Sequence, residues 1–317
     1  MQMILVGGEN LIDFIQEPPD GGHPAYRSVP GGAPFNVAKA IARQGQRVGY
    51  LTPFSTDPLG QQLAADLEAE AGMTALHPVS DCPTSLAVVS LNQGQAQYQF
   101  YRERTAERDV TIASLRAAAP ADARAFFVGS LALTDGEDAE AWAQLFVALH
   151  DGGIFTSIDP NIRAAFIHDR PAYESRLERL LAATDLLKLS DEDIAWLAPG
   201  EDPRDAARQF AARTQAGLTV LTLGSDGAFG ISGAGEIAVP VHPVPNLKDT
   251  VGAGDTFMGT LVTQAVESGR MTAGALRAME ATEVRKMLER AARAAALNCG
   301  RVGCDPPTRA ELDAQTG

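Results

Sequence analysis

Short apolar runs alternate along the chain with longer amphipathic stretches. The apolar runs have the length and composition of buried strands, and they lie at residues 4–6, 48–51, 126–128, 154–158, 186–189 and 218–223. Apolar residues at helical spacing occur between them, at residues 36–43, 139–150, 173–183 and 205–214. This alternation predicts an α/β fold in which a mostly parallel central sheet is flanked by helices on both faces. Ligands of such folds bind beyond the carboxyl ends of the strands.

Residues 11–29 and 85–104 break this alternation. The first segment contains Pro18-Pro19-Asp20-Gly21-Gly22, and in the second the runs 88–91 and 97–101 flank Asn92-Gln93-Gly94. Turn-forming residues between strand-like runs indicate β-hairpins. We expect a small β-layer apart from the main sheet, which serves as a lid or as the surface of a homodimer. Without repeats or linker-like tracts, the sequence predicts one domain over residues 1–317 with these lid segments embedded in it.

Composition and charge narrow the classes of function. The chain has 45% apolar and 21% charged residues, as ordinary globular proteins do, and a net charge of −14 without any basic run disfavours nucleic acid as a partner. The first residues contain neither a basic segment nor an apolar run long enough for a signal peptide or a membrane span, so we expect no membrane partner and a cytoplasmic location. Neither the three cysteines nor the five histidines are spaced as ligands of a transition metal.

The strongest chemical signal comes from residues 249–257, which read Asp249-Thr250-Val251-Gly252-Ala253-Gly254-Asp255-Thr256-Phe257. A predicted helix follows this segment at residues 258–266. Small residues at a helix start let the backbone amides of Gly252, Ala253 and Gly254 close on a phosphate, which the helix dipole also favours. A carboxylate there would repel phosphate, but Asp255 is well placed as a base that accepts the proton of an attacking hydroxyl. Taken alone, the segment is more typical of a tight turn with an N-terminal cap, and only the neighbouring motifs favour the phosphate cradle. A dinucleotide-binding Gly-x-Gly-x-x-Gly would follow the first strand, whereas this segment lies near the C-terminus.

This segment, together with Gly31-Gly32-Ala33-Pro34-Phe35-Asn36-Val37-Ala38 and the later Gly45, resembles the ribokinase-like PfkB family of carbohydrate kinases. The resemblance extends over nearly the whole chain. It implies a ribokinase-like fold and the ATP-dependent transfer of a phosphoryl group to a sugar hydroxyl. It also implies ATP and Mg²⁺ as cofactors, with K⁺ as a further candidate.

The resemblance implies roles for residues around the sugar. In the family the glycine pair approaches the sugar and the asparagine hydrogen-bonds it, which assigns these roles to Gly31, Gly32 and Asn36. Asp13 falls where the family places a carboxylate that binds two sugar hydroxyls. The run Tyr98-Gln99-Phe100-Tyr101-Arg102, followed by Thr105-Ala106-Glu107-Arg108, resembles the lid strand of bacterial fructokinases. We therefore expect Arg102 to reach the substrate, although its position alone equally allows a solvated strand arginine.

On the phosphate side, Asp159-Pro160-Asn161-Ile162-Arg163 matches the family's Asp-x-Asn-x-Arg segment, and Arg163 is suited to stabilise charge on the transferred phosphate. Ser190 and Asp193 stand where many relatives have Asn-x-x-Glu, a departure in both residues. The resemblance assigns the remaining positions to ATP and ions. These are Lys188, Ser190, Thr222, Gly224, Gly227 and Asn298 for ATP, Asp193 for Mg²⁺ through water, and Asp249 for a monovalent cation.

D-fructose is the substrate that the likeness to fructokinases predicts. The likeness rests on Gly8-Glu9-Asn10-Leu11-Ile12-Asp13, on the segment around Arg102 and on Cys304-Asp305-Pro306-Pro307-Thr308. The main alternative is 2-keto-3-deoxygluconate, whose carboxylate would need a cation such as Arg102 or Arg163. A nucleoside kinase would need an apolar base pocket that the sequence does not reveal. A non-catalytic sugar-binding protein would have no need of Asp255.

Overall fold

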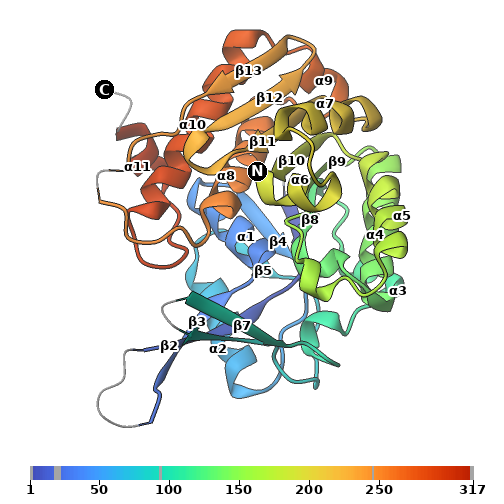
Figure 1. The fold of residues 1–317 in the computed structure, drawn as a ribbon. Coiled ribbons are helices and arrows are strands. Elements are labelled where there is room, and N and C mark those ends of the chain that lie inside the picture. Colours follow the sequence, from blue (N-terminus) through green and yellow to red (C-terminus); the bar gives the residue numbers. More distant parts are fainter. Residues whose placement is uncertain (1–2, 18–22, 93–94, 245, 315–317) are drawn as a thin grey trace.

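The main sheet lies at the centre of the molecule and is covered by helices on both faces (Figure 1). The computed structural model describes residues 3–17, 23–92, 95–244 and 246–314. Within these residues nine strands form the sheet, in the order β13-β12-β11-β10-β9-β8-β1-β4-β5. They are β1 (Met3–Gly7), β4 (Arg47–Tyr50), β5 (Met73–Ala75), β8 (Ala123–Gly129), β9 (Phe155–Asp159), β10 (Leu186–Ser190), β11 (Leu218–Thr222), β12 (Ala228–Ser232) and β13 (Gly235–Val239). In this order, the strands β11, β10, β9, β8, β1, β4 and β5 are all parallel to one another. Their carboxyl ends therefore meet at the same edge of the sheet.

Strands β12 and β13 form an antiparallel hairpin at one side of the sheet, which the apolar pattern did not predict. Glycine interrupts the apolar residues of this segment, and Gly230 lies in the middle of β12. A Cβ at this position would lie 2.9 Å from Cδ1 of Leu288 on helix α10 (Ala281–Cys299). The glycine therefore lets α10 lie close to the sheet. The prediction of a mostly parallel sheet is confirmed, with this hairpin added to it.

Successive residues of the central strands point to opposite faces of the sheet. In β1, Ile4 and Val6 belong to one hydrophobic cluster, whereas Met3 and Leu5 belong to the other. The first cluster packs under α1 (Ala33–Arg43), α2 (Pro58–Ala69), α8 (Ala253–Glu267), α9 (Ala273–Arg277) and α10. The second packs under α3 (Ile112–Ala118), α4 (Gly136–Asp151), α5 (Arg170–Leu181), α6 (Asp191–Leu197) and α7 (Pro203–Arg213), and the last helix, α11 (Arg309–Ala314), contacts α10. Among the described residues no helix has the length and apolar character needed to cross a bilayer.

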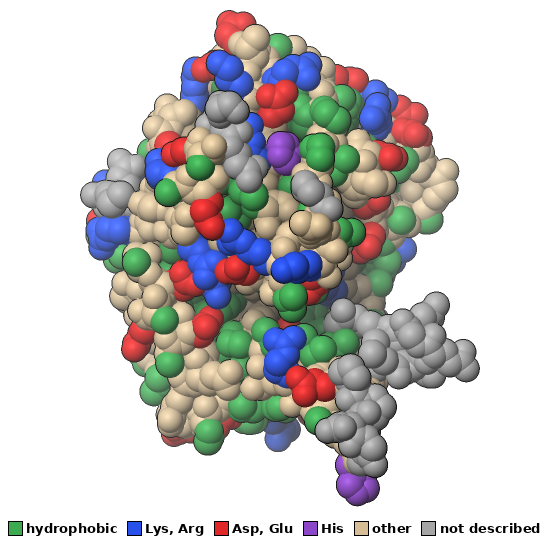
Figure 2. Space-filling view, turned by 90° about the vertical axis from the view of Figure 1, so that its left-hand side faces the viewer, with side chains coloured by type: hydrophobic (Ala, Val, Ile, Leu, Met, Phe, Trp, Pro, Cys, Tyr) green, Lys and Arg blue, Asp and Glu red, His purple; other side chains and the backbone are tan. Residues whose placement is uncertain are grey.

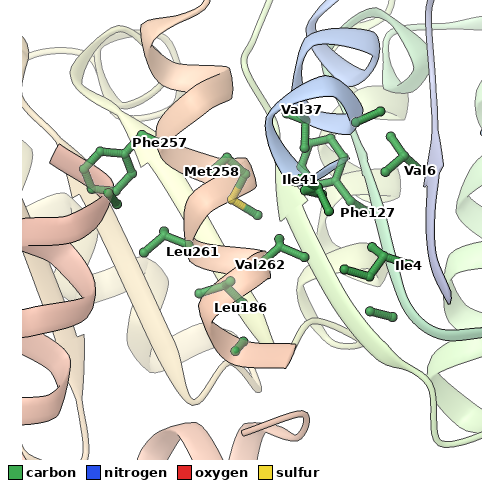
Figure 3. Packing of buried hydrophobic residues seen from close by; sticks show 14 of the residues in the cluster. Ile4, Val6, Val37, Ile41, Phe127, Leu186, Phe257, Met258, Leu261 and Val262 are labelled. Atoms are coloured by element: carbon green, nitrogen blue, oxygen red, sulfur yellow. The ribbon is translucent and has the colours of Figure 1, made fainter. Parts of the chain in front are cut away.

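Helices α1 and α8 pack against each other over the first face of the sheet (Figure 3). Their backbones approach closely because small residues meet there, and a Cβ at Gly259 would lie 2.8 Å from Cβ of Ala40. A buried hydrogen bond from Nε2 of Gln44 to Oγ1 of Thr260, 2.8 Å long, fixes the alignment of the two helices along their length. The first turns of both helices consequently lie side by side at the carboxyl edge of the sheet.

A second, smaller sheet stands apart from the main body, at the lower end of the molecule in Figure 1. Its strands are β2 (Leu11–Gln16), β3 (Tyr26–Gly31), β6 (Leu86–Asn92) and β7 (Gln95–Tyr101), in the order β3-β2-β6-β7. Pairs β2/β3 and β6/β7 are the two antiparallel hairpins expected from the sequence. The predicted turns at residues 18–22 and 93–94 lie outside the described residues. The separate β-layer is thus present, and its role as a lid stays a prediction.

Candidate active site

Asp255 lies in the first turn of α8 and is held by Asn36 in the first turn of α1. The side-chain amide of Asn36 donates a hydrogen bond of 2.8 Å to Oδ2 of Asp255. These residues are 219 positions apart in the chain, and the close packing of α1 on α8 brings them together. The sequence predicted both as site residues but did not predict that they contact each other.

Burial raises the pKa of the Asp255 carboxyl to about 6, and the carboxylate of Asp159 contributes in the same direction. The hydrogen bond from Asn36 and the positive charges of Lys188 and Arg163 oppose this rise. Asp255 is only 8% exposed. A carboxylate with this pKa is ionised at neutral pH and still basic enough to accept a proton, which is the balance that general-base chemistry requires.

A buried ion pair lies beside Asp255 at the ends of β9 and β10. The Nζ atom of Lys188 is 2.6 Å from Oδ2 of Asp159, and both side chains are buried. Burial alone would lower the pKa of the Lys188 ammonium, but the carboxylates of Asp159, Asp193 and Asp255 together outweigh burial and raise it. A Cβ added to Gly254 would lie 3.6 Å from this Nζ, so the ammonium faces the start of α8. Oδ1 of Asp159 finds no hydrogen-bond partner among the described residues.

The start of α8 has the form of an anion cradle. Gly252 precedes the helix with a left-handed φ of 74°, and a Cβ at this position would collide with Sγ of Cys304. The Ala253 amide donates to the Thr250 carbonyl, 3.2 Å away. The next two amides, of Gly254 and Asp255, belong to the helix start, where the helix itself supplies no acceptor. An anion at this point would meet these amides, the positive end of the helix dipole and Lys188.

The glycine pair forms one wall of the site between the small sheet and α1. A Cβ at Gly31 would collide with Oδ2 of Asp13 on β2, and one at Gly32 would lie 2.5 Å from the carbonyl oxygen of Glu9. Burial raises the pKa of the Asp13 carboxyl to about 6. The structure therefore brings together Gly31, Gly32, Asp13 and Asn36, and their role toward a sugar stays a prediction.

Arg102 lies behind this wall in a setting that the sequence did not predict. It is buried, not solvated, and its Nε and Nη2 donate to the two carboxylate oxygens of Glu107 at 2.7 and 3.1 Å. Glu9 completes the cluster, with its Oε1 accepting a hydrogen bond of 3.1 Å from the amide of Ala33 at the start of α1. Burial raises the pKa of Glu9 to about 7, against the opposing charge of Arg102.

The expected nucleotide side lies at the ends of β10 and β11. Thr222 ends β11, and Gly224 and Gly227 follow it with φ values of 53° and 87°. On the other side, the Asn298 side chain donates to the Val251 carbonyl at 2.7 Å and accepts from the Asp305 amide at 2.8 Å. Asn298 thus joins the segment before α8 to the loop after α10. A hollow of about 500 Å³ adjoins this loop, lined by His242, Pro243, Val244, Asn246, Ala296, Leu297, Gly300 and Arg301.

A larger hollow of about 650 Å³ lies near α11, away from Asp255, and is lined by Arg43, Glu70, Arg301 and Glu311 among others. Its charges are paired with one another, because Arg43 binds Glu70 at 2.7 Å and Arg301 binds Glu311 at 2.5 Å. Figure 2 shows this side of the molecule, with Lys and Arg side chains next to Asp and Glu side chains across its middle. Such a balanced surface offers no net field for an anionic ligand.

The two residues predicted to bind ions make structural contacts. Asp193 accepts hydrogen bonds from the amides of Ser190 and Ile162, at 2.7 and 2.6 Å, and so joins α6 to the segment that carries Arg163. Asp249 accepts from the amides of Val251 and Gly303, at 3.0 and 2.9 Å. In the described part of the chain no cluster of three or more His, Cys, Asp or Glu side chains is arranged to hold a metal ion.

Glu9, Asp159 and Glu107 were not predicted as site residues. Each is buried and charged, and each lies within or next to a segment that the sequence had singled out. Glu9 and Asp159 stand at the ends of β1 and β9, where parallel strands deliver functional side chains. That position is a signal which sequence analysis can use. Nothing in the sequence indicates the pairing of Glu107 with Arg102.

Comparisons with known proteins identify the family of this chain. Residues 1–311 match the family model described as pfkB family carbohydrate kinase. The chain is 35% identical over 255 residues to a fructokinase of Rhizobium leguminosarum bv. trifolii, covering 80% of this chain and 77% of that protein. It is 30% identical over 274 residues to fructokinase-1 of Oryza sativa subsp. japonica, covering 84% of each.

Among solved structures, the fructokinase of Xylella fastidiosa with bound ATP is 29% identical to this chain. The two structures superpose with a TM-score of 0.88 over 98% of this chain and 97% of the other. The ribokinase-like α/β fold expected from the sequence is thereby confirmed. This chain belongs to the pfkB family of carbohydrate kinases.

Proposed function

We propose that this carbohydrate kinase transfers the γ-phosphoryl group of ATP to a hydroxyl of D-fructose. The observation that carries the proposal is the buried Asp255 carboxylate, held by Asn36 at the helix start where an anion would bind. The relatives named fructokinase support the choice of sugar.

In the proposed reaction the sugar hydroxyl attacks the γ-phosphorus while its proton passes to Asp255, and the bond from phosphorus to the leaving ADP oxygen breaks. The amides of Gly254 and Asp255 lie where they would meet the transferred phosphoryl group. Lys188 faces the same point, and Arg163 lies close enough to lower the pKa of Asp255 by its charge. These fixed positive groups would stabilise the charge that builds up on the phosphoryl oxygens.

Asp13 and the Gly31-Gly32 wall are suited to bind the sugar. A carboxylate has two acceptor oxygens and can bind two hydroxyls at once, while the missing side chains of the glycines leave room beside it. Asn36 reaches both the expected sugar side and Asp255, so it would orient the acceptor and the base together. This arrangement favours a neutral polyol.

ATP would extend from this point toward Thr222, Gly224, Gly227 and Asn298. The hollow next to Asn298 has the volume and partly apolar lining that an adenine ring needs, with Val244, Ala296 and Leu297 in its wall. Ser190, at the end of β10, pairs with Thr222 at the end of β11, so the two residues lie side by side at the carboxyl edge of the sheet.

Mg²⁺ fits the oxygen-rich side chains at the ends of β9 and β10. Asp159 has a buried carboxylate oxygen that finds no hydrogen-bond partner in the described part of the chain, and Asp193 lies nearby. Such groups would hold the ion through water, as Mg²⁺ prefers when ATP supplies phosphate ligands. When bound, the ion would neutralise negative charge on the β- and γ-phosphates. Asp249 remains the candidate for a monovalent cation such as K⁺.

The alternatives are less well supported. An acid sugar would need a cation on the sugar side, where Arg102 is already paired with Glu107, whereas Arg163 acts on Asp255 at the phosphate side. A nucleoside would need a second apolar pocket beside Asp13, and neither hollow described above lies there. A sugar sensor would have no use for a buried carboxylate beside an anion cradle.

We further propose that residues 1–317 act as one cytoplasmic kinase domain in which residues 11–29 and 85–104 close over the sugar. Leu11, Ala87 and Leu131 form a small apolar cluster at the base of the small sheet, with Phe100 and Phe166 packed on it. This contact would let the sheet move against the body as a unit. Its closure would exclude water, which competes with the sugar for the phosphoryl group.

Asp255→Asn should lower kcat with fructose and ATP by about two to four orders of magnitude, because the amide cannot accept the proton. The fold and the binding of both substrates should persist, as judged by thermal unfolding and calorimetry. Asp151→Asn, an exposed carboxylate at the end of α4, is the matched control and should keep wild-type turnover. Turnover near wild type in a folded Asp255→Asn protein would remove Asp255 from the mechanism.

Fructose should be the preferred acceptor in an ADP-release screen of hexoses, pentoses, 2-keto-3-deoxygluconate and nucleosides. A sugar that leaves one buried polar group of the site unpaired should lose about 1–3 kcal/mol, or about 5- to 150-fold in kcat/KM. A higher kcat/KM for the keto-deoxy acid would reassign the substrate and leave the fold and Asp255 untouched.

The small sheet should also mediate a homodimer. Its outer strands β3 and β7 carry the exposed side chains Tyr26 and Tyr101, and an uncovered sheet edge invites pairing with a second copy. Light scattering at micromolar concentration should give twice the mass of the chain, and Tyr101→Glu should shift the protein toward the monomer. A strictly monomeric wild-type protein would contradict this part of the proposal.

A further inference from the structure

The Arg102–Glu107 pair has the geometry with which an arginine binds a substrate carboxylate. The Nε and Nη2 atoms of Arg102 contact the two oxygens of Glu107 at 2.7 and 3.1 Å, which is a bidentate arrangement. The side chains are 5% and 1% exposed, so the pair is almost fully removed from water. Nη2 also donates to the carbonyl of Leu131 at 3.4 Å.

Glu107 is itself firmly held. Its Oε1 accepts a second hydrogen bond of 2.9 Å from the hydroxyl of Ser85. The Ser85 hydroxyl oxygen is also 2.7 Å from the hydroxyl oxygen of Thr105, which in turn lies 3.0 Å from the carbonyl oxygen of Arg102. These bonds join the end of β7 to the short helix η1 (Ala106–Arg108), so the carboxylate is fixed in front of the guanidinium.

The pair lies one side chain away from the wall of the sugar site. The carboxylate of Glu9 interacts with the charge of Arg102 and, through Oε1, with the amide of Ala33 next to Gly32. The cluster of Glu9, Arg102 and Glu107 thus contains two carboxyl groups and one cation. With both carboxyl groups ionised its net charge is negative.

We propose that Glu107 determines substrate specificity by occupying the carboxylate-binding edge of Arg102, so that the kinase rejects sugars that carry a carboxylate. The inference rests on the proposed function, since it names the class of substrate that the same site excludes. An acid sugar could use Arg102 only by displacing Glu107, which would leave a buried carboxylate without its partner. A neutral sugar makes no such demand. Glu107 is a positioning residue and has no direct part in phosphoryl transfer.

The test compares kcat/KM for D-fructose and for 2-keto-3-deoxygluconate in a set of variants at pH 8. Glu107→Gln keeps an oxygen for Ser85 and Arg102 but removes the charge that neutralises Arg102. We expect kcat/KM for the acid to rise about tenfold while that for fructose changes by less than about threefold. Glu103→Gln, an exposed carboxylate in the same loop, is the matched control and should leave the ratio of the two constants unchanged.

A double variant, Arg102→Met with Glu107→Met, separates the release of Arg102 from the loss of negative charge. Apolar residues of similar volume often replace a buried ion pair without loss of stability. In this variant the ratio of kcat/KM for the acid to that for fructose should not rise above the wild-type ratio. A gain equal to that of Glu107→Gln would overturn the proposal, because no arginine would be present to bind the acid.

If Glu107→Gln does not fold, Glu107→Asp is the alternative. It retains the buried negative charge, but its side chain is one methylene shorter and holds the carboxylate farther from the guanidinium of Arg102. Its ratio of acid to fructose kcat/KM should then rise about threefold. An unchanged ratio in whichever of these two single variants folds would contradict the proposal. A wild-type preference for the acid would instead overturn the proposed substrate, so the two failures are distinguishable.

Discussion

The hydrogen bond between Asn36 and Asp255 is the interaction on which the rest of the site depends. It forms because α1 and α8 pack closely through Ala40 and Gly259 and place their first turns side by side. One of these turns belongs to the glycine-rich wall of the sugar side, and the other to the anion cradle. The same contact therefore joins the expected positions of the acceptor hydroxyl and the phosphoryl group. A larger residue in place of Gly259 would push α8 away from α1 and so separate the two halves of the site.

Burial gives the charged groups of the site their chemical character. Asp159 holds Lys188 in its charged form at the phosphate side, while burial keeps the pKa of Asp255 high enough for it to accept a proton. On the sugar side Arg102 is paired with Glu107. Both cations are thus paired with a buried carboxylate, but only Lys188 also faces the start of α8, where an anion would bind.

Much of the fold could be predicted because strand-like and helix-like periods alternate clearly, and the two hairpins of the small sheet were marked by their turn residues. The hairpin β12–β13 was not predicted because Gly230 breaks its apolar pattern. This glycine is needed because Leu288, 58 positions later in the chain, packs directly against it. Asp255, Asn36 and Asp13 could be named from local motifs. Contacts such as Asn36 with Asp255 and Arg102 with Glu107 depend on how helices and loops pack, so local patterns do not contain them. Asp193 shows the converse, since a motif position expected to bind Mg²⁺ also caps a helix and fixes a neighbouring loop.

The pH dependence of kcat/KM for fructose tests the central claim, that Asp255 acts as a buried base tuned by its surroundings. A base works in its ionised form, so a raised pKa makes activity fall as the pH drops through that value. We expect an acidic limb with an apparent pKa of about 6 in the wild type. Asn36→Ala should move this limb to higher pH, because the hydrogen bond from Asn36 stabilises the ionised carboxylate. Burial also raises the pKa of Asp13 to about 6. If protonation of Asp13 caused the acidic limb, Asn36→Ala would not move it, because Asn36 bonds to Asp255. A limb near the ordinary carboxyl pKa of 3.8, or one that Asn36→Ala does not move, would contradict the account.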